Sequence, residues 1–405
     1  MNPSPCDSDL MLKKLATEYV REDHWHEVHA SAYFGEPEIT VPDPFFGGAG
    51  PDRTGCRFCG GCMVGCRYNA KNSLDKNYLY LAEKKGLEIL TGARAEEVIP
   101  LDHDGQAGYK VLWKRGDRET RRQGDQETMR MGGGEKRGCV TAGAVILAAG
   151  VLGTVELLLR MKGTSLPNLS DKTGKDIRTN NESLIGIISR NPGYNFSKGL
   201  AIGSILDLGN RVHVEPVRYP EGSDFMRALA IPMKTGNRLL LRMAKVLGDW
   251  LIHPLDNFRI ITRRDLAPRT TILLVMQQND ITLELALGRA GLKTKLNGGA
   301  KPSVYITEAK DIASRFARLV EGKALVMAHE TLLGTPSTAH IFGGAVMGRN
   351  AREGVIDAEN RVFGYENLFV CDGSMISSNP GVNPSLTITA MAEKALSLIP
   401  CKTGM

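Results

Sequence analysis

A strand, an acidic turn and a helix are predicted from one run near the end of the chain, Phe369-Val-Cys-Asp-Gly-Ser-Met-Ile-Ser-Ser-Asn-Pro-Gly-Val-Asn-Pro-Ser-Leu-Thr-Ile-Thr-Ala-Met-Ala-Glu-Lys-Ala-Leu396. The apolar residues 368–370 predict a buried strand, which the turn 372–374 ends. Asn383 and Pro384 favour a helix N-cap followed by proline at the first helical position. An acidic turn and a helix N-terminus therefore meet, and free N–H groups there favour an anion. A capped helix that only closes the core would show the same pattern.

The identities of the residues in this run are more informative than its apolar pattern. Asp-Gly-Ser followed by G-V-N-P-x-x-T-I-x-A-x-A-E resembles the C-terminal flavin-binding segment of the glucose–methanol–choline (GMC) oxidoreductases. Within that family it is most similar to the cholesterol oxidases that hold FAD non-covalently. The family places a histidine upstream in a His-x-x-Gly-Gly context, and this chain has His340-Ile-Phe-Gly-Gly344.

A second block of resemblance lies earlier in the chain. Residues 66–79 continue into a run similar to G-K-x-S-L-D-K-x-Y-L of the cholesterol oxidases. Residues 145–159 resemble their G-A-G-S-L-G-S-T-E-L-L strand–turn–helix, and Ser165-Leu-Pro-Asn-Leu169 their T-L-P-N-L. The resemblance covers residues 66–170 and 335–400 and is most specific in the second range.

The resemblance implies roles for individual residues. His340 matches the histidine that orients the substrate hydroxyl and takes its proton, a task that suits an imidazole. Asn383 matches the second active-site residue, and the helix that follows it would stabilise the reduced flavin, which is anionic. The implied contacts to FAD come from the following residues: Ala95, Gly150, Asp372, Gly373, Asn383 and Pro384.

The expected fold class is α/β, or α+β overall, with an incomplete Rossmann-like FAD-binding domain and an antiparallel substrate domain. Residues 1–55 form a loop-rich segment, and residues 145–149 read as a strand buried on both faces. The antiparallel sheet is predicted from five runs, 184–189, 212–217, 271–277, 281–287 and 292–296, with helices over 72–85 and 308–319. The expected domains are 56–165 and 336–405 for FAD and 166–335 for substrate.

Composition excludes several classes of protein. The 405 residues are 42% hydrophobic and 24% charged, as in globular proteins. A net charge of +6 without an aromatic ladder gives no support for nucleic-acid binding. No signal peptide or run of 18 apolar residues is evident, so we expect a cytoplasmic protein with reduced cysteines.

Four cysteines have the spacing of an iron–sulfur site, Cys56-x2-Cys59-x2-Cys62-x3-Cys66. Arg67 stands where the ferredoxin run has proline, and the run occurs once. A loop of reduced thiols and a metal or cluster site stay open as alternatives, and we expect no metal. The histidines at 24, 26 and 29 lack a matching cysteine or carboxylate pattern and are expected to be solvated.

Residues 237–253 have an apolar helical pattern with one narrow polar stripe, Arg238, Arg242, Lys245 and Asp249. A helix buried in the core on most sides is the preferred interpretation. The alternative is a lid that makes transient contact with a membrane surface and admits an apolar substrate.

Two features depart from the family. Steroid-specific members isomerise a double bond with a glutamate of the substrate domain, but this chain has no glutamate between Glu221 and Glu284. Asp256 and Asp265 are the acidic residues in this region that could replace that glutamate. In addition, no G-x-G-x-x-G motif opens the chain, so the glycine loop that would bind the FAD pyrophosphate is missing.

The preferred interpretation is a cholesterol-oxidase-like enzyme that oxidises a sterol or another bulky secondary alcohol, with oxygen or another acceptor reoxidising FAD. One rival is a truncated, inactive or two-chain member that needs a partner chain carrying the nucleotide-binding unit. The other is an iron–sulfur or metal-binding electron carrier that uses Cys56 to Cys66.

The missing glycine loop leads to the first testable prediction. The isolated 405-residue chain should bind FAD weakly and tend to aggregate, because the pyrophosphate lacks its helix N-terminus and the strand at 145–149 has an unpaired edge. A segment carrying G-x-G-x-x-G, fused or added, should restore binding. Fluorescence quenching measures this, and tight stoichiometric binding by a monodisperse monomer would contradict it.

Overall fold

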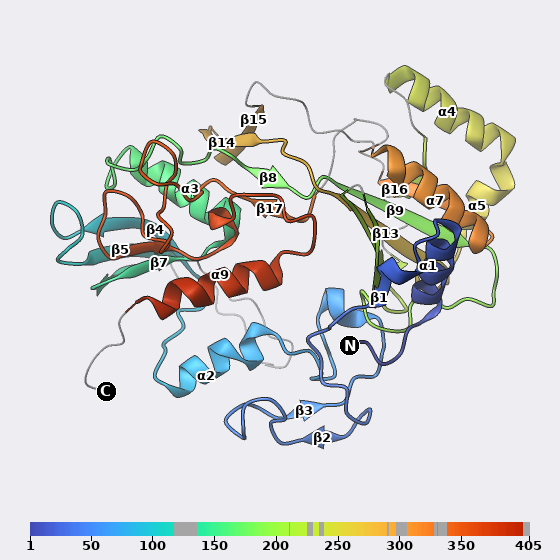
Figure 1. Cartoon of the computed structure of the whole chain (residues 1–405), viewed down its shortest axis with the longest axis horizontal. Helices are drawn as coiled ribbons and strands as arrows, with labels where there is room; N and C mark the ends of the chain where they lie inside the picture. Colours follow the sequence, from blue (N-terminus) through green and yellow to red (C-terminus); the bar gives the residue numbers. More distant parts are fainter. Residues whose placement is uncertain are drawn as a thin grey trace. The chain divides into compact units, whose positions relative to one another are not determined.

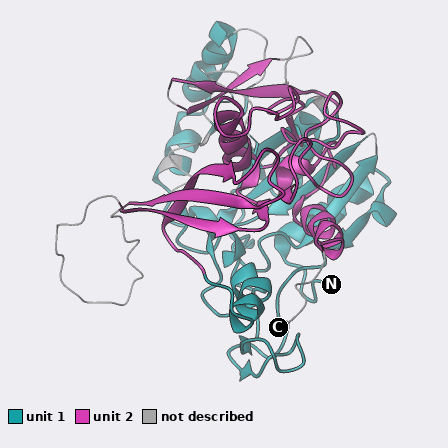
Figure 2. Ribbon diagram, turned by 90° about the vertical axis from the view of Figure 1, so that its left-hand side faces the viewer, with its two compact units in different colours: residues 1–88, 181–279, 302–339 teal, residues 89–180, 280–301, 340–405 magenta. Residues whose placement is uncertain are grey.

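The computed structural model describes residues 1–116, 136–209, 211–224, 230–234, 239–289, 291–296, 306–327, 330 and 338–399. The chain divides into two compact units, which Figure 2 colours separately. Unit 1 comprises residues 1–88, 181–279 and 302–339. Unit 2 comprises residues 89–180, 280–301 and 340–405. Each unit is therefore assembled from three separate stretches of sequence.

Unit 1 is built on an antiparallel sheet. Its described strands, in spatial order, are β1 (Trp25–Glu27), β10 (Ser204–Gly209), β11 (Val212–Val217), β13 (Thr270–Gln277), β9 (Glu182–Ser189), β16 (Gly322–Met327) and β12 (Ala230–Pro232). Alternate side chains of β13 enter two clusters, Leu273 and Val275 on one face and Leu274 and Met276 on the other. Both faces are thus buried, and the predicted strands at 184–189, 212–217 and 271–277 are confirmed. The runs 281–287 and 292–296 are also strands, but their assignment to this sheet is wrong, because Leu283–Gly288 and Gly291–Leu296 pair with each other in unit 2.

Two helices cover one face of this sheet, α1 (Asp7–Glu18) and α7 (Thr307–Leu319), as Figure 1 shows. Their apolar stripes, which include Leu12, Leu15 and Phe316, pack into the same cluster as Leu273. The helix predicted over 308–319 is confirmed.

The other described elements of unit 1 are short. They are η1 (Glu22–His24), β2 (Thr40–Val41), β3 (Arg53–Thr54), η2 (Gly61–Val64), η3 (Leu74–Lys76), α2 (Tyr78–Lys84), α4 (Leu239–Ile252), α5 (Pro254–Thr262) and α6 (Leu266–Arg269). The single helix predicted over 72–85 is wrong, because a 3₁₀ turn and α2 are separated by Asn77. Asn72, at the start of the predicted range, does not cap a helix. Its side-chain oxygen instead accepts a hydrogen bond from Arg53 at 2.9 Å.

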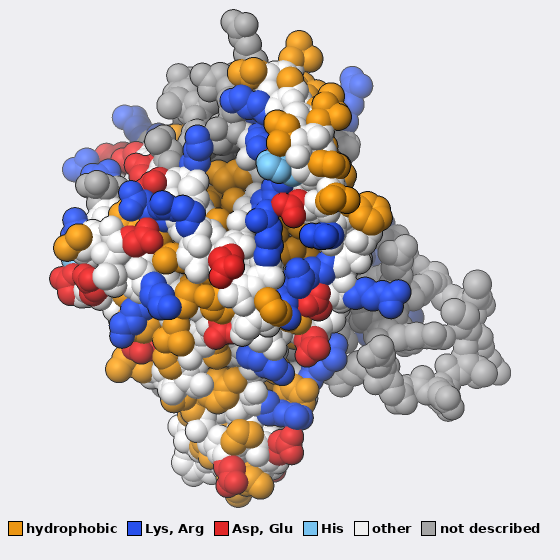
Figure 3. Space-filling view, turned by 90° about the vertical axis from the view of Figure 1, so that its right-hand side faces the viewer, with side chains coloured by type: hydrophobic (Ala, Val, Ile, Leu, Met, Phe, Trp, Pro, Cys, Tyr) orange, Lys and Arg blue, Asp and Glu red, His pale blue; other side chains and the backbone are white. Residues whose placement is uncertain are grey.

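Helix α4 does not lie in the core, so the preferred interpretation of residues 237–253 is wrong over the described part. Its leucines point outward, with Leu240 80% exposed and Leu251 74% exposed. Arg242 and Asp249, from the polar stripe, are buried instead. Residues 237 and 238 lie outside the described residues. Lys245, from the same stripe, is exposed. Figure 3 shows hydrophobic side chains gathered at the top of the view, where Figure 1 places α4 and α5. The helix is therefore amphipathic, with Arg242 and Asp249 turned toward the protein.

The carboxylate of Asp249 fixes this orientation. Its two oxygens lie 2.8 Å from Lys234 Nζ and 2.6 Å from Lys323 Nζ, and Asn257 Nδ2 donates to it at 3.1 Å. Burial opposes ionisation of Asp249, but the hydrogen bonds from these partners outweigh it and hold its pKa below the usual range. Asp249 thus ties α4 to α5 and to β16.

Unit 2 has a parallel pair of strands at its centre, β7 (Val145–Leu147) and β18 (Leu368–Val370). Its other described elements are β4 (Ala93–Pro100), β5 (Tyr109–Arg115), β6 (Lys136–Ala142), α3 (Gly150–Lys162), β8 (Arg178–Thr179), β14 (Leu283–Gly288), β15 (Gly291–Leu296), β17 (Ile341–Phe342), η5 (Gly373–Met375) and α9 (Ser385–Ser397).

The core of unit 2 packs α3 against the strand pair. Leu158, Phe342, Leu368 and Val370 are buried together there. Within the described ranges, β7 pairs with β18 and with no other strand, and Ile146 on β7 is exposed. The prediction that β7 is buried on both faces is wrong to this extent.

Across the parts of the chain that the structure describes, no helix is both long enough and apolar enough to cross a bilayer.

Asp249→Asn should detach α4 from the protein. The change leaves two lysines beside a neutral amide, and breaking a buried ion pair costs about 3–5 kcal/mol. Because the folded pKa of Asp249 is lowered, its stabilisation is present at neutral pH and is lost as the pH falls below the ordinary aspartate range. Faster amide exchange in α4, measured by mass spectrometry, would report both effects.

The matched control is Asp171→Asn, which removes an exposed carboxylate that pairs with Lys162 at 2.6 Å. This variant should exchange as the unmodified protein does. Unchanged protection of α4 in Asp249→Asn would contradict the anchoring role.

Candidate active site

The end of β18 is tied to the start of α3 by Asp372. One carboxylate oxygen accepts hydrogen bonds from the backbone N–H and the hydroxyl of Ser374, at 2.8 and 2.6 Å. The other accepts a short hydrogen bond from the hydroxyl of Thr154. That hydroxyl in turn accepts from Ala149 N at 3.1 Å. The predicted flavin contacts Asp372, Gly373 and Gly150 are therefore held in one place, where the helix begins.

The two glycines after His340 let the next segment approach this turn closely. Gly343 has φ +80°, and a Cβ there would lie 2.1 Å from the carbonyl oxygen of Asp176. Gly344 has φ +94°, and its Cβ would lie 2.5 Å from Val155 on α3. Gly343 N donates to Gly373 O at 3.1 Å. The His-x-x-Gly-Gly pattern is thus required by packing at two positions.

His340 contacts a residue that sequence reasoning missed, Asn180. The side-chain nitrogen of Asn180 lies 3.1 Å from His340 Nδ1 and 2.9 Å from the carbonyl oxygen of Val382. The pairing of β8 with β17 brings the two residues together, since Thr179 lies opposite Ile341. No motif marked Asn180; the signal was its place next to a strand that pairs with the histidine segment.

These contacts determine how the imidazole is protonated. A carbonyl oxygen only accepts, so Val382 fixes the amide of Asn180 with its NH₂ group toward both neighbours. His340 Nδ1 is then the acceptor, and the neutral ring carries its hydrogen on Nε2. The ring can donate a hydrogen bond from Nε2 to the oxygen of a bound hydroxyl compound.

Asn383 follows Val382 directly, so the Asn180 contact places it near His340. Both side chains are partly exposed and within reach of a ligand. The predicted cap needs a correction: Pro384, with φ −86°, occupies the N-cap of α9, and the helix starts at Ser385. Asn383 lies one residue before the cap, because proline itself takes the helical conformation there.

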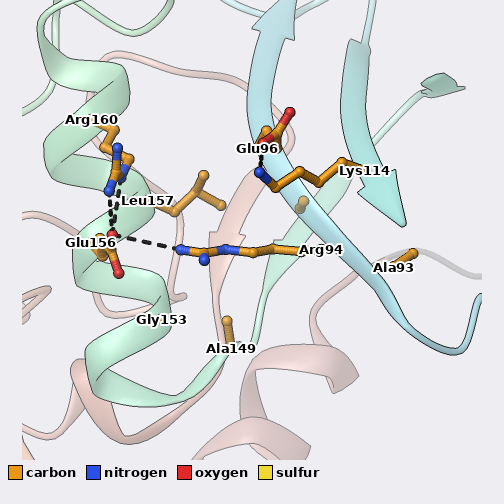
Figure 4. Close-up of a pocket in the computed structure, with 10 residues that line it drawn as sticks. Ala93, Arg94, Glu96, Lys114, Ala149, Gly153, Glu156, Leu157 and Arg160 are labelled. Carbon is orange, nitrogen blue, oxygen red and sulfur yellow. Dashed lines mark hydrogen bonds and ion pairs between the residues drawn. The ribbon is translucent and has the colours of Figure 1, made fainter. Parts of the chain in front are cut away.

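A cavity of about 440 Å³ lies beside the first turns of α3 (Figure 4). It is lined by Ala93, Arg94, Ala95, Glu96, Lys114, Ala149, Gly153, Glu156, Leu157 and Arg160. The strand register shifts between Ala95 and Glu97, which interrupts the ladder at Ala95. A Cβ at Gly150, with φ +71°, would meet nothing within 4 Å. Backbone at Ala95, a helix N-terminus and this open space fit a nucleotide such as the FAD predicted from sequence.

Charged side chains border the same cavity. Glu156 Oε1 accepts a hydrogen bond from Arg160 Nη2 at 2.5 Å and lies 3.6 Å from Arg94 Nη2. Glu96 Oε1 lies 3.1 Å from Lys114 Nζ. Figure 4 shows Arg94 crossing from β4 toward Glu156 on α3. These three ion pairs border the cavity, and its other lining residues include the small side chains of Ala93, Ala95 and Ala149 and no side chain at Gly153.

The four cysteines at 56, 59, 62 and 66 lie in a loop region of unit 1. Cys56, Cys62 and Cys66 pack with Leu200 and Ala70. All four thiols are reduced, and within the described residues no group of three or more His, Cys, Asp or Glu side chains has the geometry to hold a metal ion. The expectation that they bind no metal stays a prediction.

Two of these thiols differ in acidity. Burial raises the pKa of Cys56. Burial also opposes ionisation of Cys66, but backbone N–H groups of Lys71, Tyr68 and Ala70 donate to its sulfur and lower its pKa. In unit 2, burial and the neighbouring carboxylate of Asp372 raise the pKa of Cys371 to about 11. Of these three thiols, Cys66 is thus the one with the largest fraction of reactive thiolate at a given pH.

Iodoacetamide at mildly alkaline pH should therefore modify Cys66 faster than Cys56 or Cys371, because the thiolate is the reactive form and a larger fraction of Cys66 is ionised. Peptide mass spectrometry measures the rates, with the exposed Cys139 as the reference thiol. Equal rates at Cys56 and Cys66 would contradict the assignment. Iron and zinc contents of the same sample test the expectation that the cysteines hold no metal.

Comparisons with known proteins show the family to which the chain is similar. Two family models described as GMC oxidoreductase match residues 49–164 and 284–392. A cholesterol oxidase of Acinetobacter baumannii is 40% identical over 413 residues, covering 98% of this chain and 71% of that protein. One from Mycobacterium tuberculosis is 38% identical, covering 99% of this chain and 69% of its own length.

Solved structures show more distant similarity. A formate oxidase structure matches with 15% identity and a TM-score of 0.48, over 80% of this chain and 62% of that one. The chain thus spans about seven tenths of the curated relatives and a smaller share of this structure.

Proposed function

Because the chain belongs to the GMC oxidoreductase family, we propose that it uses FAD to oxidise a sterol or another bulky secondary alcohol to the ketone. The family predicted from residues 66–170 and 335–400 is confirmed by the matches, and so are the expected mixture of helices and sheets and the flavin cofactor. Bound FAD supplies the acceptor for the hydride that leaves the carbinol carbon. Oxygen, or another acceptor, would remove the electrons from the reduced cofactor.

The contact between Asn180 and His340 carries this proposal. Asn180 is completely buried, and its amide orients the imidazole so that Nε2–H is directed to the substrate hydroxyl. The role implied by the resemblance, removal of the hydroxyl proton by His340, would need a lone pair on Nε2. His340 therefore acts as an orienting donor, and the hydroxyl proton leaves to another acceptor, such as water.

The remaining site residues would contact different parts of the cofactor. Asn383 would contact the substrate hydroxyl and the flavin edge. Pro384 caps α9, whose N-terminus would stabilise the negative charge of the reduced ring. Gly373 would lie beside this ring system, and Asp372 accepts hydrogen bonds from Thr154 and Ser374, so its role is to position the turn.

The adenosine end belongs in the cavity beside α3. Ala95 would offer backbone groups to the adenine, and Gly150 would let the phosphates approach the helix N-terminus. The two cholesterol oxidases that share 38–40% of their residues with this chain favour a sterol as the substrate.

His340→Ala should lower turnover of the flavin-loaded protein on a sterol by about two to three orders of magnitude, the effect of removing one positioned hydrogen-bond donor. His340→Gln keeps an N–H donor but has no basic nitrogen, so it should lose clearly less. Asn180→Asp is the matched change. A carboxylate only accepts hydrogen bonds, so it would favour the imidazole tautomer that carries its hydrogen on Nδ1 and leaves Nε2 without one. Nε2 could then no longer donate to the substrate hydroxyl, and turnover should fall although His340 is still present.

Steady-state turnover is compared at equal flavin content, which the visible spectrum measures, and thermal unfolding checks that each variant is folded. Equal losses in His340→Ala and His340→Gln, together with full activity in Asn180→Asp, would show that His340 removes the proton. Normal turnover in His340→Ala would overturn the proposed site altogether.

A further inference from the structure

A buried glutamate begins the strand that follows Asn180. Glu182 is the first residue of β9, and only 5% of its surface is exposed. Removing a carboxylate from water is costly unless hydrogen bonds replace the lost solvent. Neither the sequence motifs nor the proposed reaction assigns a task to this side chain. The groups that it contacts therefore indicate what its burial achieves.

The carboxylate of Glu182 binds the main chain next to the candidate active-site histidine. Ala339 N donates a hydrogen bond to Glu182 Oε2 at 2.7 Å, across 157 residues of sequence. This distance is at the short end for N–H···O bonds, as is usual where the acceptor is a carboxylate. Ala339 directly precedes His340. The bond thus fixes the main chain one residue before the imidazole.

The start of β9 is itself firmly held. Asn181 has φ 45°, in the left-handed region that asparagine adopts more readily than most residues. Its side-chain nitrogen donates to Gln277 Oε1 at 2.9 Å, and Glu182 lies opposite Met276 on β13. Glu182 therefore extends its carboxylate from the antiparallel sheet, which is a rigid support for the bond to Ala339.

Asn180 and Glu182 hold different parts of the histidine segment. Asn180 lies against the ring at Nδ1, and Glu182 binds the main chain at Ala339. A ring that is held at one nitrogen alone still swings when its main chain moves. With the main chain held as well, both ends of the side chain are restrained, and this sets the direction of Nε2. Such support matters in an active site, because a displacement of about 1 Å can lower the rate about a hundredfold.

We propose that Glu182 is a positioning residue for His340, because its carboxylate holds the main chain at Ala339 and so directs Nε2 of the imidazole toward the substrate hydroxyl. This task requires a hydrogen-bond acceptor with the length of a glutamate side chain. It does not require the negative charge, and no proton is transferred to Glu182. The inference rests on the proposed function, since the direction of Nε2 matters only if His340 acts on a hydroxyl group.

Three substitutions test this role in the flavin-loaded protein. Glu182→Ala removes the acceptor and should lower kcat on a sterol by about tenfold to a hundredfold with little change in KM. Glu182→Gln keeps an oxygen acceptor at the same length and should retain most of the turnover. Glu182→Asp keeps the charge but is one methylene shorter, so it should lose turnover as Glu182→Ala does.

Amide exchange, measured by mass spectrometry, reports the hydrogen bond independently of activity. The Ala339 N–H should exchange faster in Glu182→Ala and Glu182→Asp, and Glu182→Gln should keep most of its protection. Asp7→Ala is the matched control, because Asp7 Oδ2 also accepts a main-chain N–H at 2.7 Å, from Asn195. This control should lose protection at Asn195, keep it at Ala339 and show normal kcat per folded protein.

Thermal unfolding checks that each variant is folded. Equal losses of kcat in Glu182→Gln and Glu182→Ala would overturn the proposal, because the charge and not the hydrogen bond would then be needed. Normal kcat in folded Glu182→Ala, or unchanged exchange at Ala339, would overturn it as well. If Glu182→Ala does not fold, the contrast between Glu182→Gln and Glu182→Asp decides in the same way.

The two readouts separate this inference from the proposed function. Sterol oxidation that none of the three substitutions lowers would leave the proposed function standing and remove only the positioning role. A protein that oxidises no sterol, but loses protection at Ala339 in Glu182→Ala, would remove the proposed function and leave the bond with a structural role alone.

Discussion

The hydrogen bonds of one carboxylate, Asp372, hold the candidate site together. They join the end of β18 to the start of α3 through Thr154, which lies 218 residues earlier in the chain. Because Asp372 is buried, water could not replace a lost partner, and the carboxylate would be left with an unsatisfied hydrogen bond. The turn that follows can then accept the backbone of Gly343 and Ala345, and the histidine segment takes its place from that contact.

Around this fixed turn, side chains with different tasks can be placed accurately. The parallel strand pair supplies the rigid base, while His340 and Asn383 come from loops next to it, where side chains remain accessible. Asn180 adds a constraint of another kind, since a buried amide with an acceptor-only neighbour has one orientation. A single backbone carbonyl, that of Val382, thereby selects the form of the imidazole.

Sequence predicted those parts of the molecule that short-range patterns determine. The strand at 212–217 and the helix at 308–319 follow from apolar periodicity, and His340 and Asn383 from a motif. Asn180 was missed because its partner lies 160 residues away. The orientation of α4 was predicted wrongly for a related reason. Periodicity separates the two faces of a helix, but the lysines that bind Asp249 decide which face turns inward. One of them, Lys323, lies on β16 and far from α4 along the chain.

The division of each unit into three separate stretches has a consequence for biosynthesis. A ribosome that has just released residue 180 has delivered α3 and Asn180, but β18, Asp372 and the histidine segment appear more than 150 residues later. At about 5–20 residues per second, α3 waits on the order of ten seconds for its strand partner. During that interval its apolar face is open to chaperones, and translation speed through residues 181–339 becomes a determinant of yield.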